Sequence, residues 1–218
     1  LELVGMAGLI AVLLGLPAGV LAGLGAGRAP DRVLSALAGL ALSIPVFVVG
    51  TLVVLVGAQQ LRLVPAGGYV PFAADPLRHL GLLLMPAGTI AVGLGAVVFR
   101  VTRASVLEVL ERDHVRAAQA RGVAPWATVR RHVLRNALTP VVTVVALHLG
   151  SLLGGTVLVE FVFNWPGLSG YLVRAVEARD YPEVLGIVLV ISVLFVLLNF
   201  LVDMLYAVID PRVRHGAA

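Results

Sequence analysis

Long apolar runs separated by short polar segments dominate the chain. Five of these runs are long enough to cross about 30 Å of hydrocarbon, which takes roughly 20 helical residues. They cover residues 3–27, 33–61, 80–99, 140–159 and 184–209. Pro45 predicts a kink in the second run, and Pro86 predicts an interruption of the third. The pattern therefore predicts five membrane-spanning helices.

The composition supports this prediction. Of the 218 residues, 60% are hydrophobic and only 13% are charged, and the mean hydropathy is +1.03. Soluble domains carry about 25% charged residues, so a soluble core of this length could not bury the apolar excess. We expect an all-α integral membrane protein, a polytopic helical bundle that forms a single transmembrane domain over residues 1–218.

Several classes of chemistry are excluded by the residues that the chain lacks. It has no lysine, so it cannot contain a phosphate-binding P-loop, which ends in Gly-Lys-Ser/Thr. It has no cysteine, and its 5 histidines show no His-x-x-x-His spacing, so we expect no metal site, cofactor or enzyme activity in this chain. Gly23, Gly25 and Gly27 resemble part of a dinucleotide fingerprint, but no strand precedes them. Close helix packing is the better interpretation.

The arginines predict an orientation. Of the 16 arginines, 12 lie in residues 28–32, 100–139 and 210–218. The positive-inside rule makes these segments cytoplasmic, with the N-terminus of the chain outside and the C-terminus inside. The same clustering explains the isoelectric point near 10.3 without any binding of nucleic acid. Because the chain starts outside, directly before an apolar run, we expect a further span to precede Leu1.

The segment of residues 100–139 is too long for a tight connection and predicts two helices. The first is expected over residues 102–121, where Glu108–Arg112 and Asp113–Arg116 are spaced to pair on a solvated face. Gly122 has the place of a residue that ends a helix in the left-handed conformation.

The second of these helices is expected to begin at Pro125. It has an apolar stripe formed by Trp126, Val129, Val133 and Ala137. A helix of this kind can lie on the lipid headgroups or dock on a partner protein, and the pattern alone does not separate these alternatives.

Residues 116–122, with the sequence Arg-Ala-Ala-Gln-Ala-Arg-Gly, resemble the EAA motif of ABC importer permeases, which is Glu-Ala-Ala, three residues, then Gly. Four further segments match the same family in its order along the chain: Ser43-Ile44-Pro45, the longer string over residues 102–140, EFVFNWPGL at residues 160–168, and Asp210-Pro211-Arg212. Together they resemble the binding-protein-dependent peptide/nickel permeases, in particular the B-type subunit of dipeptide and oligopeptide importers. Arg116 stands where the general motif has Glu, so any salt bridge of that Glu is missing.

The resemblance implies the permease subunit of an ATP-driven ABC importer in the bacterial inner membrane. Such a subunit would translocate di- or oligopeptides, nickel or a related solute by alternating access. The implied partners are a second permease subunit in a heterodimer, two cytoplasmic ATPases that bind ATP and Mg, and an extracytoplasmic solute-binding protein. The implied ATPase-coupling residues are Arg116, Ala117, Ala118, Gly122, Trp126, Val129 and Val133.

Four polar residues in the apolar runs or directly after them are candidates for a pore or gate. His148 could line the pore or bond to a neighbouring helix, and Glu160 could gate the outer mouth or mark the membrane interface. Asn199 and Asp203 lie one turn apart, and Asp203 is either functional or paired with a cytoplasmic arginine. The alternative function is a secondary transporter driven by an ion gradient, which would predict inverted repeats and charges at mid-membrane. Asp203 is the only acidic residue inside a run.

Overall fold

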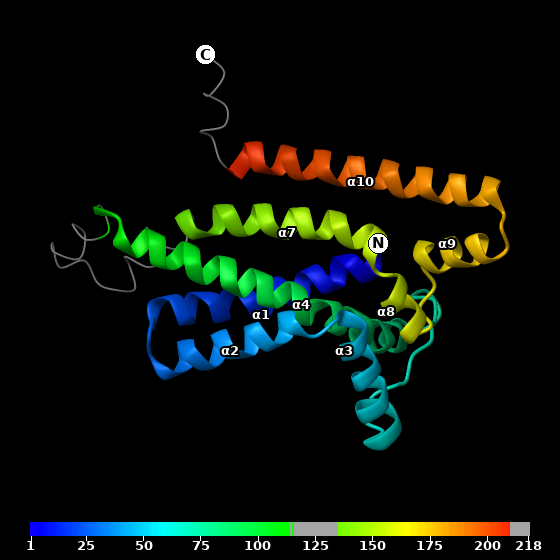
Figure 1. Ribbon diagram of the computed structural model, residues 1–218, viewed down its shortest axis with the longest axis horizontal. Coiled ribbons are helices and arrows are strands. Elements are labelled where there is room, and N and C mark those ends of the chain that lie inside the picture. The colour runs from blue at the N-terminus through cyan, green and yellow to red at the C-terminus, as the bar shows by residue number, and fades with distance from the viewer. Residues whose placement is uncertain (114, 116–134, 210–218) are drawn as a thin grey trace, which may run out of the picture.

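The computed structural model describes residues 1–113, 115 and 135–209, and the secondary structure of these residues is entirely helical (Figure 1). The elements are α1 (Glu2–Leu24), α2 (Ala29–Ser43), α3 (Val46–Leu52), the π-helical η1 (Val53–Gln60), α4 (Pro76–Glu111), α7 (Arg135–Gly155), α8 (Val157–Val162), α9 (Leu168–Glu177) and α10 (Tyr181–Ile209).

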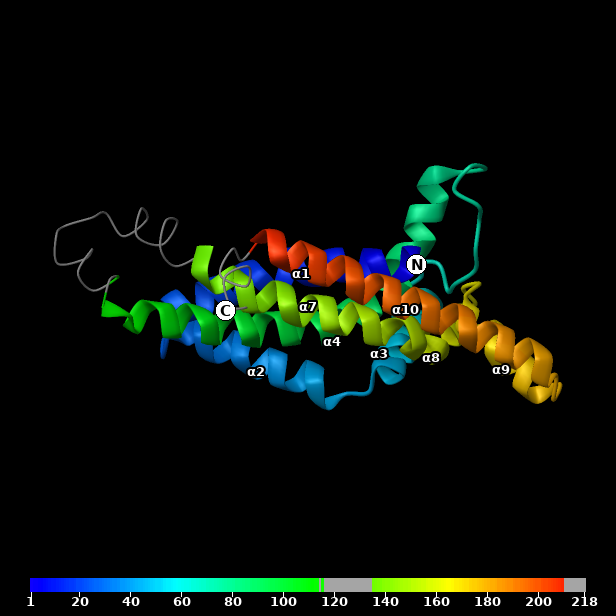
Figure 2. The same cartoon turned by 90° about the horizontal axis from the view of Figure 1, so that it is seen from above.

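The long helices lie side by side and alternate in direction. α10 packs on α7, α7 on α4, and α4 contacts both α1 and α2. The α1–α2 turn, the end of α4, the start of α7 and the end of α10 share one end of the bundle, whereas α3, α8 and α9 lie at the other (Figure 1). Figure 2 shows η1 projecting from the side of the bundle. The arginine-rich segments that the structure describes therefore meet at one end, as the predicted orientation requires.

Fewer helices qualify as spans than the sequence predicts. In the described part of the chain, three helices are long and apolar enough to cross a membrane, namely α1, α4 and the Tyr181–Leu201 part of α10. A fourth span results if α2 and the following α3–η1 helix count as one, although they are bent by 99°. The apolar part of α7, Pro140–Leu152, is shorter than such a span. The count of five and the further span before Leu1 stay predictions.

The two prolines behave differently from the prediction. At Pro45 the second run is broken into two helices, which is more than a kink. Pro86, in contrast, does not interrupt α4, which continues through it from Pro76 to Glu111. Pro86 is fully buried, whereas Pro45 is exposed. Of these two prolines, only Pro86 has neighbouring helices packed around its missing hydrogen bond. Burial is not required for a helix to continue, however, because α1 runs through the exposed Pro17.

Three further boundaries correct the sequence analysis. The helix expected to begin at residue 102 is the continuation of α4, which ends at Glu111 rather than at residue 121. Arg112 follows in an extended conformation, with φ −69° and ψ 140°. The fourth run is not one helix to residue 159, because α7 ends at Gly155 and α8 begins at Val157.

Among the described helices, α1 and α4 share the most extensive contact, and small residues of α1 make its tightest points. A Cβ atom at Gly15 would lie 2.5 Å from the carbonyl oxygen of Gly95, and one at Gly19 would lie 2.7 Å from that of Phe99. At Gly23 it would lie 2.7 Å from Val106 Cγ1. The two backbones can approach this closely only because α1 presents glycine at every fourth residue from 15 to 23.

Close packing is thus confirmed for Gly23 but not for Gly27. A Cβ atom at Gly27 would meet nothing within 4 Å, and this residue instead adopts φ +78° in the turn that follows α1. Gly25 is the C-terminal cap of α1, and its N–H donates to the carbonyl of Leu21.

At the end of the bundle opposite the arginine-rich end, an aromatic cluster surrounds His79. This residue is 2% exposed, and its Nδ1 lies 2.7 Å from the carbonyl oxygen of Val70. The rings of Tyr69, Phe72 and Trp165 contact the imidazole edge-on at centroid distances of 5.5 to 5.7 Å. The cluster holds the connection of residues 61–75 against the first turn of α4.

The α1–α4 contact predicts a clear difference between two glycines of α1. We expect Gly19→Ala to lower the free energy of unfolding by about 1–3 kcal/mol, because the added methyl group would force the backbones apart. Gly5→Ala is the matched control, since a Cβ atom at Gly5 meets nothing within 4 Å. Thermal stability of the two variants in detergent measures the difference. Equal stability would show that α1 and α4 are not in backbone contact.

Candidate functional site

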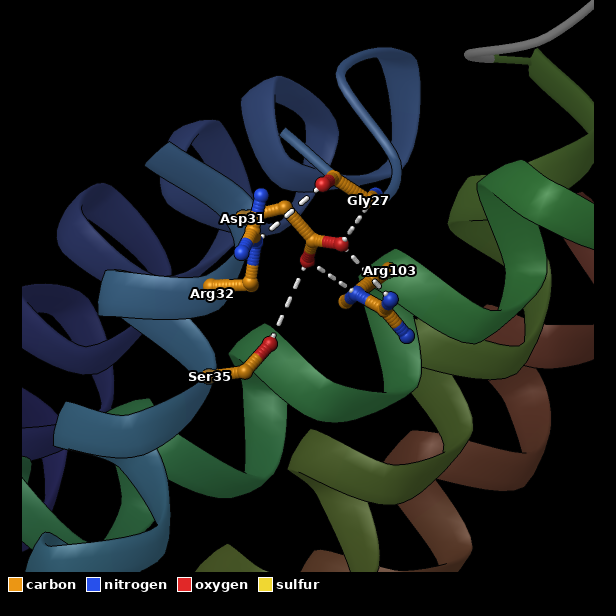
Figure 3. A network of polar contacts seen from close by, with 5 residues as sticks. All are labelled: Gly27, Asp31, Arg32, Ser35 and Arg103. Atoms are coloured by element: carbon orange, nitrogen blue, oxygen red, sulfur yellow. Dashed lines mark hydrogen bonds and ion pairs between the residues drawn. The ribbon is translucent and has the colours of Figure 1, made fainter. Parts of the chain in front are cut away.

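A buried carboxylate at the arginine-rich end connects three parts of the fold (Figure 3). Asp31 of α2 is 3% exposed. Arg103 of α4 binds both of its oxygens, with Nε 2.5 Å from Oδ1 and Nη2 2.9 Å from Oδ2. The backbone N–H of Gly27 donates to Oδ2 at 2.8 Å, and the hydroxyl of Ser35 donates to Oδ1 at 3.2 Å. The carboxylate therefore joins the α1–α2 turn, α2 and α4.

The local sequence explains why Asp31 is placed there. Gly27 in its left-handed conformation ends the turn, and Pro30 lies in the first turn of α2. Asp31 follows in that same first turn, where the positive end of the helix dipole favours a carboxylate. Arg32 donates from Nε to the carbonyl of Gly27 at 3.2 Å and braces the turn from the other side (Figure 3).

This pair is not predicted from the sequence. The sequence pattern assigns Arg103 only a role in setting topology, and no role is predicted for Asp31. The available signal was that Asp31 is the one acidic residue in the arginine-containing connection of residues 28–32. Nothing local pointed to Arg103, which lies 72 residues away along the chain.

The pair lies close to the segment that resembles the coupling motif. Arg103 is eight residues before Glu111, the last residue of α4, which corresponds to about 12 Å along the helix axis. Glu108 follows Arg103 in α4, and its carboxylate accepts a hydrogen bond from Arg112 Nη2 at 2.7 Å. Both side chains are exposed, which confirms the predicted pair on a solvated face.

The predicted coupling residues lie outside the described residues. These residues are Arg116, Ala117, Ala118, Gly122, Trp126, Val129 and Val133. Because Arg116 is among them, the expected Asp113–Arg116 pair is not tested either. Their predicted roles are unchanged by the structure.

Glu160 lies in α8 rather than at the end of a long span, and it is 8% exposed. Its carboxylate accepts from the hydroxyl of Thr156 at 2.8 Å and from the backbone N–H of Gly170 at 3.1 Å. Ser169, also buried, lies 3.4 Å from the Thr156 hydroxyl. The carboxylate thus fastens the first turn of α9 to α8, and a gating role for Glu160 remains a prediction.

Two of the other pore candidates, His148 and Asn199, bond within their own helices. His148 Nδ1 lies 3.0 Å from the carbonyl oxygen of Val144, so this contact is not the expected bond to a neighbouring helix. Asn199 donates to the carbonyl of Phe195 at 2.8 Å. Asp203 lies on α10, but its side chain is outside the described part of the structure. A role in the pore stays a prediction for all three. Among the described residues, no group of three or more His, Cys, Asp or Glu side chains could hold a metal ion.

The Glu160 network predicts an effect of a single methyl group. A Cβ atom at Gly167 would overlap the Glu160 carboxylate, so Gly167→Ala must displace this side chain from its bonds to Thr156 and Gly170. We expect a loss of about 1–3 kcal/mol in unfolding free energy. Gly170→Ala is the control, because its Cβ atom meets nothing within 4 Å. Proteolysis of α9 in detergent measures the effect, and equal rates in the two variants would contradict it.

Comparison with known proteins gives a consistent result. The family described as binding-protein-dependent transport system inner membrane component matches residues 15–215. A protein named as a peptide permease protein in Brucella ovis is 41% identical over 210 residues, which is 94% of this chain and 65% of that protein. The glutathione transport system permease protein GsiC of Escherichia coli K12 is 42% identical over 205 residues, 94% of this chain and 64% of its own length. The chain therefore spans just under two thirds of these relatives.

Solved structures share the fold. A chain of the MetNI methionine ABC transporter in an inward-facing conformation aligns with a TM-score of 0.76 at 20% identity, covering 96% of this chain and 93% of that one. A chain of an amino acid ABC transporter aligns with a TM-score of 0.71 at 17% identity, covering 94% and 88%. With the match over residues 15–215, these findings show that the chain belongs to the family of inner membrane components of binding-protein-dependent transport systems.

Proposed function

We propose that this chain is the permease subunit of an ATP-driven ABC importer that moves a small solute inward across the bacterial inner membrane. The observation that carries the proposal is the family match over residues 15–215. The names of the relatives favour a peptide as the solute, since one is named for peptides and another for glutathione. Nickel or a related solute is the second class that the sequence resemblance suggests.

The proposed assembly contains a second permease subunit in a heterodimer, two cytoplasmic ATPases and an extracytoplasmic solute-binding protein. ATP and Mg would bind to the ATPases, because this chain has no lysine and so no P-loop. In this assembly the arginine-rich end of the bundle faces the cytoplasm, with the N-terminus of the chain outside and the C-terminus inside. Family membership favours this importer over an ion-driven secondary transporter.

The segment after α4 is the proposed contact with the ATPases. α4 continues as a helix to Glu111, well past the apolar run that was expected to end at residue 99. The EAA-like residues and the stripe of Trp126, Val129 and Val133 follow it in the sequence. A docked helix transmits motion only if its contacts differ between the states of the ATPase dimer. We infer that ATP-driven closure acts on this segment and, through α4, on the spans.

Substitutions at Gly122 and Trp126 test this function. A residue with a Cβ atom costs roughly 1–2 kcal/mol in the left-handed conformation that we infer for Gly122. Covering each apolar side chain of the stripe contributes about 1.5–3 kcal/mol. We expect Gly122→Val to leave membrane insertion intact, weaken ATPase binding and abolish uptake, and Trp126→Ala to act in the same direction but more mildly.

The measurements are co-purification of the ATPase with the full-length permease and uptake of labelled peptide. Gly5→Val is the control for adding a β-branched side chain at an open position. Normal ATPase binding and uptake in both variants would mean that the segment is a surface helix and not a docking helix.

A further inference from the structure

The Asp31–Arg103 pair provides the main polar connection between α2 and the rest of the bundle at the arginine-rich end. α2 buries only two of its 15 residues, Asp31 and Ala38. Ala38 packs in a small cluster with Ala22, Ala96 and Phe99, against which the partly buried Leu34 and Ala41 of α2 also pack. Such a light apolar contact leaves the position of α2 to depend on the carboxylate that binds Gly27, Ser35 and Arg103.

α1, in contrast, needs no ion pair to stay on α4. Its glycines bring the two backbones together along three turns, up to Gly23 beside Val106. The carbonyl of Arg103 also lies 3.3 Å from the Cβ position of Gly23. Arg103 therefore lies where the α1–α4 contact ends, and its guanidinium extends that contact to α2.

α2 is well placed to carry a movement across the bundle. Its 15 residues span about 22 Å. At its far end the chain breaks at Ile44–Pro45 and turns by 99° into α3 and η1. An open apolar groove of about 640 Å³ lies at this bend, between Ala41, Ile44, Val53 and Met85. A displacement of the Asp31 end would therefore change the far end of α2, beside the groove.

We propose that Asp31 and Arg103 are a positioning pair that couples α2 to the cytoplasmic end of α4. When the segment after Glu111 moves, α4 moves the α1–α2 turn and α2 with it as one body, and the bend at Pro45 moves in response. The inference rests on the proposed function, because the moving force is ATP-driven closure of the partner ATPases. Neither residue contacts solute in this role, so both act through the position of α2.

The geometry distinguishes this role from setting topology. A topology determinant needs only a positive charge beside a span. Arg103 instead binds both carboxylate oxygens with two nitrogens, a planar arrangement that lysine cannot reproduce. Arg103→Lys would therefore keep the orientation of the chain and lose the coupling, which separates the two roles in one variant.

The experiment compares uptake of labelled glutathione and alanyl-alanine per ATP hydrolysed in proteoliposomes that contain the complete importer. We expect Asp31→Asn and Arg103→Lys to lower this ratio about tenfold, within the range typical of allosteric coupling, while the assembly and its ATPase activity persist. Because the two residues act as one unit, the uptake per ATP of the double variant should be no lower than that of the more defective single variant. Glu108→Gln and Arg112→Lys are the matched controls, since this ion pair is exposed and lies at the end of α4, with Arg112 directly after its last residue.

A second measurement reports the movement directly. The chain has no cysteine, so spin labels can be attached at Leu37 of α2 and Glu111 of α4 alone. We expect one narrow distance distribution in the native importer with and without ATP, a broad one in Asp31→Asn, and a narrow one in Glu108→Gln.

The outcomes separate the inference from the proposed function. No uptake of either peptide by the native importer would count against the proposed peptide importer. Native uptake with unchanged ratios and distances in Asp31→Asn and Arg103→Lys would overturn the positioning pair alone. A loss of assembly in both variants would also overturn it, because the pair would then only stabilise the fold.

Discussion

The backbone contact between α1 and α4 is the constraint on which the rest of the structure depends. Glycines at every fourth residue of α1 let the two helices approach until a single added Cβ atom would meet a carbonyl oxygen at Gly15 and Gly19. In a membrane, lipid tails are as apolar as leucine, so helices associate through close packing rather than through the hydrophobic effect. This contact fixes the turn after α1, and with it the place where Asp31 can meet Arg103.

Two buried carboxylates then fasten elements that bury few apolar side chains of their own. Asp31 holds α2 at the arginine-rich end, and Glu160 holds the first turn of α9 at the opposite end. They differ in their partners. Asp31 has a guanidinium, whereas Glu160 accepts from a hydroxyl and a backbone N–H in the described structure. Helices such as α2 and α9, which bury few apolar side chains, can use such polar contacts to fix their orientation while leaving room for movement between states.

The sequence predicts the first and last helices well because the length of their apolar runs alone determines them. Residues 3–27 and 184–209 match α1 and α10 to within a few residues, apart from the turn at Gly25–Gly27. The prolines show the limit of this reasoning. Pro45 and Pro86 carry the same local signal, yet the helix breaks at the exposed Pro45 and continues through the buried Pro86. α1 also continues through the exposed Pro17, so neither the local signal nor burial alone predicts which proline breaks a helix.

The candidate site shows the same limit more strongly. The coupling residues could be named from the EAA-like run because that motif is contiguous. The Asp31–Arg103 pair could not be predicted from the sequence, because its members are 72 residues apart and meet only after α1, α2 and α4 have packed. Glu160 was noticed for its place in the sequence, but its bonds to Thr156 and Gly170 depend on the break between α7 and α8.

The most direct test of this account is a disulfide across the α1–α4 contact. A Cβ atom at Gly95 would lie 3.7 Å from Ala11 Cα, which is within reach of a disulfide. A protease site inserted into residues 61–75 lets the chain be cut between α1 and α4. We predict that Ala11→Cys with Gly95→Cys keeps the two fragments joined after cleavage until reductant is added. Gly5→Cys with Gly95→Cys should release them. Equal release from both pairs in native membranes would show that the backbones of α1 and α4 are not in contact.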